Sequence, residues 1–199
     1  MRHLRVLPSW IGRVTQATAN AKSDTRTMTS YVALGANLPS DRFGPPRATL
    51  QAALDLLGAR GLKIARRSSW YESAPVPASD QPWFINAVVR LDGAPEPARL
   101  LAVLHDLEGE LGRVRSVANA PRAVDLDLLD ADGRVSEVAG WPELPHPRLH
   151  ERAFVLMPLK EIAPDWRHPA NGTHIDVLLA ALPSGQTCRR AADGDLPES

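Results

Sequence analysis

The chain has 199 residues, of which 44% are hydrophobic, and its 23 basic residues balance 23 acidic ones. A net charge of zero gives no reason to expect binding to nucleic acid or to an anionic membrane surface, and no apolar run reaches the length of a membrane span. The single cysteine, Cys188, excludes an internal disulfide and a metal site built from cysteines. We therefore expect a single-domain, monomeric protein of the reducing cytoplasm.

The two ends of the chain differ in composition from its middle. Residues 1–27 carry five basic residues against one acid, with scattered Ser and Thr. Such a segment can be an organelle transit peptide, but a disordered extension or a mis-called start is the simpler interpretation. Residues 184–199 are polar and are expected to form a disordered tail. The expected domain therefore spans residues 28–183.

Strand-like and helix-like patterns alternate within this domain. The clearest helix, 97–111, carries a stripe of leucines and stops at Gly112. In chain order, the expected elements are a strand at 31–36, a helix at 46–57, strands at 63–71 and 84–91, a helix at 97–111, strands from 125 and at 134–138, and helices at 152–162 and 175–182. The second and third strands could pair as a hairpin with a long connection. This mixture predicts an α+β sandwich, with helices packed on a largely antiparallel sheet.

The connection from Glu72 to Pro82 contains three prolines. A loop of this length inside a compact domain is more often functional than idle, which suggests a mobile lid. The alternative is a rigid surface loop whose prolines only restrict the unfolded chain. The sequence favours neither.

Two carboxylates stand two residues apart on the strand that begins at Asp125. Side chains alternate between the faces of a strand, so Asp125 and Asp127 point the same way while Leu126 and Leu128 point the other way. Two like charges held this close repel each other unless a hard cation such as Mg²⁺ lies between them. The pair therefore predicts a magnesium site.

Three arginines lie just upstream of the acid pair, at Arg113, Arg115 and Arg122. Planar guanidinium groups match phosphate oxygens, so acids and arginines together indicate phosphate chemistry. A zinc pair at His146 and His150 is a weaker alternative, because the neighbouring prolines break a helix and no cysteine completes the site.

Further blocks of sequence accompany the acid pair in a fixed order. They are Tyr31–Leu38, Asp80–Val88, Gly112–Arg115, Ala120–Leu129, Leu144–Arg148 and Arg152–Leu159. In this order and spacing they resemble the 6-hydroxymethyl-7,8-dihydropterin pyrophosphokinase family of folate biosynthesis, over roughly residues 30 to 183. The resemblance implies a ferredoxin-like fold, two Mg²⁺ ions, and transfer of pyrophosphate from ATP to the pterin hydroxymethyl oxygen with release of AMP.

The resemblance also implies a role for individual residues. Asp125 and Asp127 would bind the metal ions, and Arg113 and Arg122 would be the catalytic residues that stabilise the transition state. The expected ATP-binding residues are His105, Glu108, Arg115, Ser116, His146 and Arg152. The expected pterin-binding residues are Ser73, Ala74, Val76, Phe84, Asn86 and Phe154, with the two phenylalanines on opposite faces of the pterin.

The chain departs from the better-known family pattern near the nucleotide. The segment from Ser116 to Ala120 is one residue shorter. The substitutions are Ala118 for an arginine, Asn119 for a tryptophan, His105 for a glutamine, Glu143 for a threonine, Pro147 for a tyrosine and Ala123 for a threonine. None of the predicted metal ligands or catalytic arginines is lost, so we expect activity with an altered ATP affinity.

Two other functions are compatible with parts of the sequence. The acid pair could serve another Mg²⁺-dependent enzyme that transfers a nucleotidyl or glycosyl group, in which the aromatic pair would be idle. Alternatively, a ferredoxin-like fold could be a non-catalytic binding module, for example for RNA. That function predicts aromatic residues on a basic sheet face, whereas this chain is neutral overall.

Overall fold

The computed structural model describes residues 28–112, 124–137 and 140–192. Six strands form one sheet in the order β5-β1-β4-β3-β6, with β2 also paired to β4, and every pair is antiparallel. The strands are β1 (Thr29–Ala36), β2 (Lys63–Arg67), β3 (Tyr71–Ser73), β4 (Phe84–Asp92), β5 (Asp125–Ala131) and β6 (Cys188–Arg190). The helices are α1 (Pro46–Ala59), α2 (Pro97–Glu110), the short 3₁₀ helix η1 (Leu149–Glu151), α3 (Ala153–Ile162) and α4 (Ile175–Ala180).

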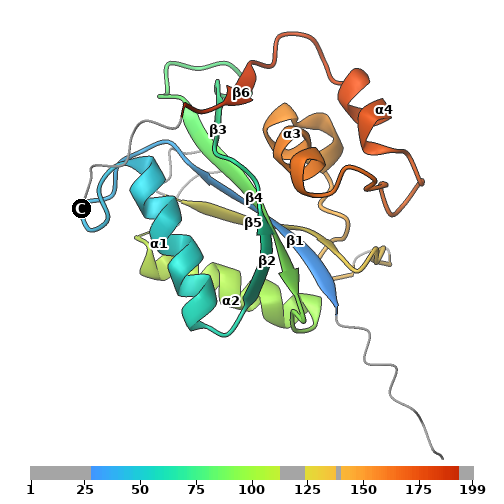
Figure 1. Ribbon diagram of the computed structural model, residues 1–199, viewed down its shortest axis with the longest axis horizontal. Coiled ribbons are helices and arrows are strands. Elements are labelled where there is room, and N and C mark those ends of the chain that lie inside the picture. Colours follow the sequence, from blue (N-terminus) through green and yellow to red (C-terminus); the bar gives the residue numbers. More distant parts are fainter. Residues whose placement is uncertain (1–27, 113–123, 138–139, 193–199) are drawn as a thin grey trace, which may run out of the picture.

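Helices cover both faces of the sheet. Figure 1 shows α1 and α2 on one face and α3 and α4 on the other. Strand β4 is buried from both sides, because Val89 packs in the apolar cluster under α1 and α2 while its neighbour Val88 packs in the cluster under α3 and α4. This alternation follows from the period of two along a strand. The predicted α+β sandwich with a largely antiparallel sheet is therefore confirmed.

The predicted strand at 63–71 is split into β2 and β3, both of which pair with β4. The break lies at Ser68, whose hydroxyl accepts a hydrogen bond from the Val88 N–H at 3.0 Å, while the Ser68 N–H donates to the Val88 carbonyl at 3.0 Å. A side chain thus takes the place of a backbone acceptor in the ladder. The predicted pairing of this segment with the next strand is confirmed.

The strand predicted at 134–138 is wrong for the described residues 134–137, which form no strand. The side chain of Ser136 explains this difference. Its hydroxyl accepts from the Leu144 N–H at 2.8 Å, and its own N–H donates to the Leu144 carbonyl at 2.8 Å. A local turn therefore satisfies the backbone groups that a neighbouring strand would have bonded.

The C-terminal residues also differ from the prediction. Residues 188–190 form β6, an edge strand in which Cys188 pairs with Ser73 and Arg190 pairs with Tyr71. The predicted disordered tail is therefore wrong for residues 184–192, while residues 1–27 and 193–199 lie outside the described part of the chain. Within that part, no helix is long and apolar enough to cross a membrane.

Strand register places the important side chains in one row across the sheet. Gly35 of β1 pairs with Asp125 of β5 on one side and with Asn86 of β4 on the other. Asn86 in turn pairs with Tyr71 of β3. Because paired residues point to the same face, an acid and an amide from distant parts of the chain lie on the same side of the sheet.

Candidate active site

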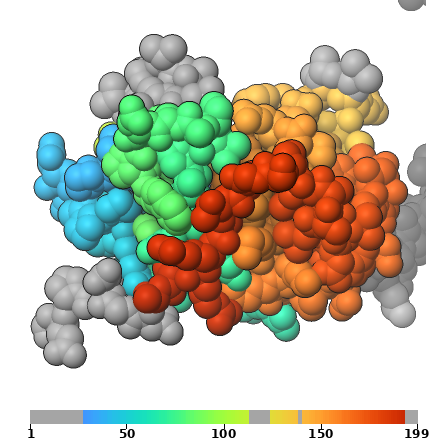
Figure 2. All heavy atoms as spheres, turned by 90° about the horizontal axis from the view of Figure 1, so that it is seen from above, coloured from blue at the N-terminus to red at the C-terminus, as the bar shows by residue number. Residues whose placement is uncertain are grey.

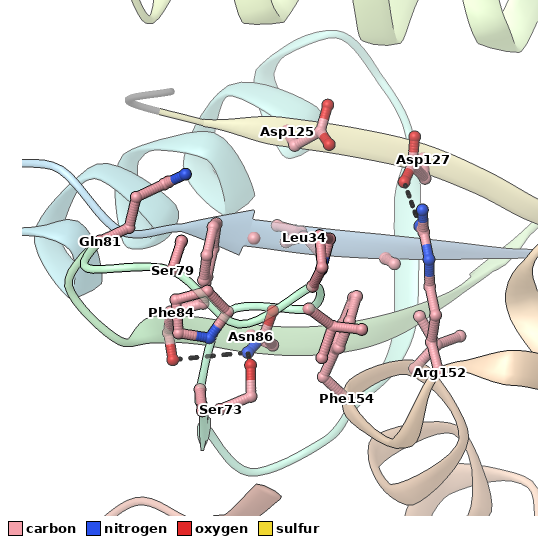
Figure 3. Close-up of a pocket in the computed structure, with 17 residues that line it drawn as sticks. Leu34, Ser73, Ser79, Gln81, Phe84, Asn86, Asp125, Asp127, Arg152 and Phe154 are labelled. Carbon is pink, nitrogen blue, oxygen red and sulfur yellow. Dashed lines mark hydrogen bonds and ion pairs between the residues drawn. The ribbon is translucent and has the colours of Figure 1, made fainter. Parts of the chain in front are cut away.

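A pocket of about 190 Å³ lies where the end of the sheet, the loop after β3 and the N-terminus of α3 meet. Figure 3 shows Asp125 and Asp127 at one side of this pocket, and Ser73, Phe84 and Asn86 at another. The pocket thus joins two groups of side chains of different chemistry.

The acid side of the pocket follows from the alternation of β5. Asp125 and Asp127 are half-buried and line the pocket, whereas Leu126 and Leu128 are 1% and 4% exposed and belong to the core under α1 and α2. The predicted orientation of the acid pair is therefore confirmed.

Glu108 of α2 holds strand β5 in place. Its side chain is 2% exposed, and its carboxylate accepts a hydrogen bond from the Leu126 N–H at 2.8 Å. Neither Glu108 nor His105, one turn earlier in α2, lines the pocket. In this structure Glu108 therefore fixes the strand that carries the acids, and the predicted contact of both residues with ATP stays a prediction.

Two basic side chains converge on Asp127, and both were predicted to bind ATP. Arg152, at the N-cap of α3, places Nη1 3.7 Å from Asp127 Oδ2, as Figure 3 shows. His146 places Nε2 3.9 Å from the same oxygen. The Arg148 N–H donates to His146 Nδ1 at 3.1 Å, so the proton of the neutral ring lies on Nε2. His146 is thus a hydrogen-bond donor beside the acids.

Burial, reinforced by the charge of Arg152, lowers the pKa of His146 from 6.5 to about 4. Between these two pH values the unfolded chain binds more protons than the folded one. The free energy of unfolding therefore rises with pH across this window. The contribution of His146 to stability is fully present above pH 6.5 and is lost as the pH falls toward 4.

We expect His146 to contribute about 2 to 3 kcal/mol to this pH dependence in the ligand-free protein. Denaturant unfolding at pH 7 and pH 4.5 should show a smaller loss of stability for His146→Gln than for the wild type. Comparing the two proteins cancels the contribution of His168, whose pKa burial also lowers. Equal losses in both proteins would contradict the buried neutral state of His146.

The six predicted pterin-binding residues all line the pocket. They are Ser73, Ala74, Val76, Phe84, Asn86 and Phe154. The two phenylalanines come from different elements, since Phe84 begins β4 and Phe154 lies in the first turn of α3. The Arg152 guanidinium lies 5.5 Å from the centre of the Phe154 ring, which links the aromatic side of the pocket to the acid side.

The amide of Asn86 has a fixed orientation. Its Nδ2 donates to Ser73 Oγ at 3.0 Å and to the carbonyls of Tyr71 and Phe84 at 3.4 Å, and the residue is 3% exposed. The other amide atom, Oδ1, would lie 3.3 Å from a Cβ placed on Gly35. The glycine therefore leaves room for the amide oxygen at the pocket wall.

Several pocket residues were not predicted, among them Leu34, Gly35, Ser79 and Gln81. Asn37, just after β1, was also missed; its Nδ2 donates to Gln81 Oε1 at 3.0 Å and to the Pro82 carbonyl at 3.3 Å. Both Asn37 and Gln81 lie in the sequence blocks that resemble the family, and this resemblance is the feature of the sequence that could have predicted them.

Four predicted site residues lie outside the described part of the chain. These are Arg113, Arg115, Ser116 and Arg122. Their predicted roles stay predictions. Three of the positions that depart from the family pattern, Ala118, Asn119 and Ala123, also lie outside the described residues.

Comparison with known proteins bears on the fold and the family. Residues 31–164, well over half of the chain, match the family model of 7,8-dihydro-6-hydroxymethylpterin-pyrophosphokinase (HPPK). The chain belongs to this family. A protein of Pseudomonas aeruginosa named 2-amino-4-hydroxy-6-hydroxymethyldihydropteridine pyrophosphokinase is 41% identical over 154 residues, which cover 77% of this chain and 91% of that relative. A protein of the same name from Methylorubrum extorquens is 41% identical over 159 residues, covering 78% and 95%.

Solved structures support the same fold. The crystal structure of an HPPK-DHPS from Plasmodium falciparum matches with a TM-score of 0.60 at 13% identity, over 80% of this chain and 46% of that longer one. The ferredoxin-like fold predicted from the sequence is confirmed. Membership of the HPPK family favours the pyrophosphokinase over the two alternative functions.

Proposed function

We propose that this HPPK-family enzyme transfers pyrophosphate from ATP to 6-hydroxymethyl-7,8-dihydropterin and releases AMP, as a step of folate biosynthesis. ATP is the co-substrate. The observation that carries the proposal is the row across the sheet, which places Asp125 and Asn86 on either side of Gly35 in one pocket. A carboxylate suited to bind a metal ion and an amide suited to hydrogen-bond a heterocycle thus share one site.

We propose that Asp125 and Asp127 hold two Mg²⁺ ions. Their half-buried carboxylates suit a hard cation, and among the described residues no group of three or more His, Cys, Asp or Glu side chains is arranged to hold a metal. Phosphate oxygens and water would supply the other ligands, as is usual for Mg²⁺. When bound by these two carboxylates, the metal ions would supply positive charge that neutralises phosphate charge.

The protein side chains have the task of placing the two substrates. Arg152 and the Nε2–H of His146 are suited to bind phosphate oxygens, because both lie beside Asp127 and both can donate. Arg113 and Arg122 are proposed to stabilise the charge that develops on the transferred group. Phe84 and Phe154 would hold the flat pterin between them.

This arrangement can align the hydroxymethyl oxygen with the β-phosphorus of ATP. The bond from that oxygen to the β-phosphorus forms while the bond from the β-phosphorus to the α,β-bridging oxygen breaks. The bridging oxygen stays on AMP, and the hydroxyl proton is lost to water. Holding both substrates in line increases the rate, because their translational and rotational entropy is already lost on binding, before the chemical step.

A product assay tests the proposal. The full chain incubated with Mg²⁺, ATP and hydroxymethyl-dihydropterin should release AMP in amounts equal to the pterin consumed, and no AMP without the pterin. A nucleotidyl transferase would release pyrophosphate instead, and a binding module would release neither. Absence of AMP with the pterin present would overturn the proposed function.

A further inference from the structure

The pterin loop, residues 74–83, leaves β3 and returns to β4. It contributes Ala74, Val76, Ser79 and Gln81 to the wall of the pocket. Within the part of the chain that the structure describes, no hydrogen bond joins residues 75–80 to the rest of the protein. The position of the loop over the pocket therefore depends on how its two ends are held.

Asn37 holds the second end of this loop through its bonds to Gln81 and Pro82. Residues 187–189, at the start of the C-terminal strand β6, contact both ends. The Ala74 N–H donates to the Thr187 carbonyl at 3.1 Å. The Arg189 guanidinium donates from Nε and Nη2 to Glu72 Oε2 at 3.0 and 2.9 Å, just before the loop begins. Its Cζ also lies 5.0 Å from the centre of the Trp83 ring, where the loop ends. One side chain thus contacts the residues on both sides of the loop opening.

The space-filling view agrees with these contacts. In Figure 2 the red C-terminal residues lie between the green residues around the pterin loop and the orange residues of α3. The C-terminal segment therefore lies beside the pterin loop, although its own side chains do not line the pocket.

We infer that Arg189 is a positioning residue for pterin binding, an inference that rests on the proposed function. By joining Glu72 and Trp83, it favours the loop position in which Ala74, Val76 and Gln81 face the pocket. When only a fraction of the molecules has the loop in the binding-competent position, the apparent Kd for the ligand equals the intrinsic Kd divided by that fraction. Arg189 therefore acts on the affinity for pterin and leaves ATP binding unchanged.

The neighbouring residue provides a matched control. Arg190 lies on the same strand, and its side chain is 63% exposed, close to the 66% of Arg189. It forms an ion pair of similar length, 3.0 Å, but with Glu161 of α3 instead of the loop end. Replacing Arg190 removes the same charge and a comparable contact without touching the loop ends.

Steady-state kinetics should separate the two variants. Arg189→Ala should raise KM for the pterin by about threefold to tenfold, with kcat and KM for ATP within about twofold of the wild type. Glu72→Gln should have a smaller effect in the same direction, and the double variant should be no worse than Arg189→Ala alone. Arg190→Ala should leave all three constants unchanged.

Hydrogen exchange gives a second measurement that does not depend on the substrate. Amide hydrogens of residues 74–83 should exchange faster in Arg189→Ala than in the wild type, and at the wild-type rate in Arg190→Ala. If the wild type releases no AMP but loop exchange responds as expected, the proposed function fails while the loop-positioning role stands. If loop exchange and the pterin KM are the same in Arg189→Ala as in the wild type, or change equally in Arg190→Ala, the inference is wrong.

Discussion

Replacement of Asp127 by alanine is expected to abolish pyrophosphate transfer, with kcat lowered by about 10³-fold or more. The substitution removes one of the two carboxylates proposed to hold Mg²⁺. It also leaves Arg152 and His146 without the oxygen on which both converge. The Asp127 side chain is 34% exposed and lines the pocket, so the fold should persist. AMP release at saturating substrates measures the loss, and thermal unfolding monitored by circular dichroism checks the fold.

Asp176→Ala is a suitable control for this experiment. Asp176 also forms an ion pair, with Lys160, and its side chain is 54% exposed, but it lies on α4 and does not line the pocket. Its replacement should leave kcat unchanged. Near-normal turnover in Asp127→Ala would contradict the assignment of the metal site.

Local patterns in the sequence predicted most of the elements. The leucine stripe of α2 and the alternation around Asp125 each reflect which side of an element is buried, and burial repeats with the period of the element. Those periods also predicted that the two acids share a face. The apolar residues in these patterns are buried in the core of the structure, which confirms both predictions.

Strand β6 could not be predicted in this way. Its three residues, Cys-Arg-Arg, show no apolar alternation, because the strand is held by backbone bonds to β3 and by ion pairs with Glu72 and Glu161. Backbone pairing at a sheet edge and surface ion pairs have no periodic signature in the sequence. The same reason applies to Glu108, whose partner is a backbone N–H on another element.

The row that builds the site also required the structure. Asp125, Gly35 and Asn86 are far apart in the chain, and only strand order and register bring them together. The family resemblance predicted Asp125 and Asn86 separately, each as a member of its own motif. The role of Gly35 as the place where the amide oxygen fits beside β1 follows from the register and from the 3.3 Å between Oδ1 and a Cβ placed on Gly35.

Replacement of Asn86 by leucine, a side chain of similar size, is expected to lower kcat/KM for the pterin by about 10²-fold. Because three oxygens fix Nδ2, the acceptor Oδ1 is the atom available to the ring amino group of the substrate. Removing it leaves that substrate donor without a partner inside the pocket. The KM for ATP should change little, because Asn86 lies on the opposite side of Gly35 from the acids.

An analogue of the pterin without its ring amino group distinguishes loss of this hydrogen bond from general damage to the pocket. The wild type should bind the analogue much more weakly than the natural substrate, whereas Asn86→Leu should bind the two almost equally, because the variant cannot make the bond with either. The substitution should also lower the free energy of unfolding by about 1 to 3 kcal/mol, since the acceptors around Nδ2 lose their buried donor. Titration calorimetry at a temperature well below the unfolding midpoint keeps the two effects apart. Discrimination as strong in the variant as in the wild type would show that another group reads the amino edge of the pterin.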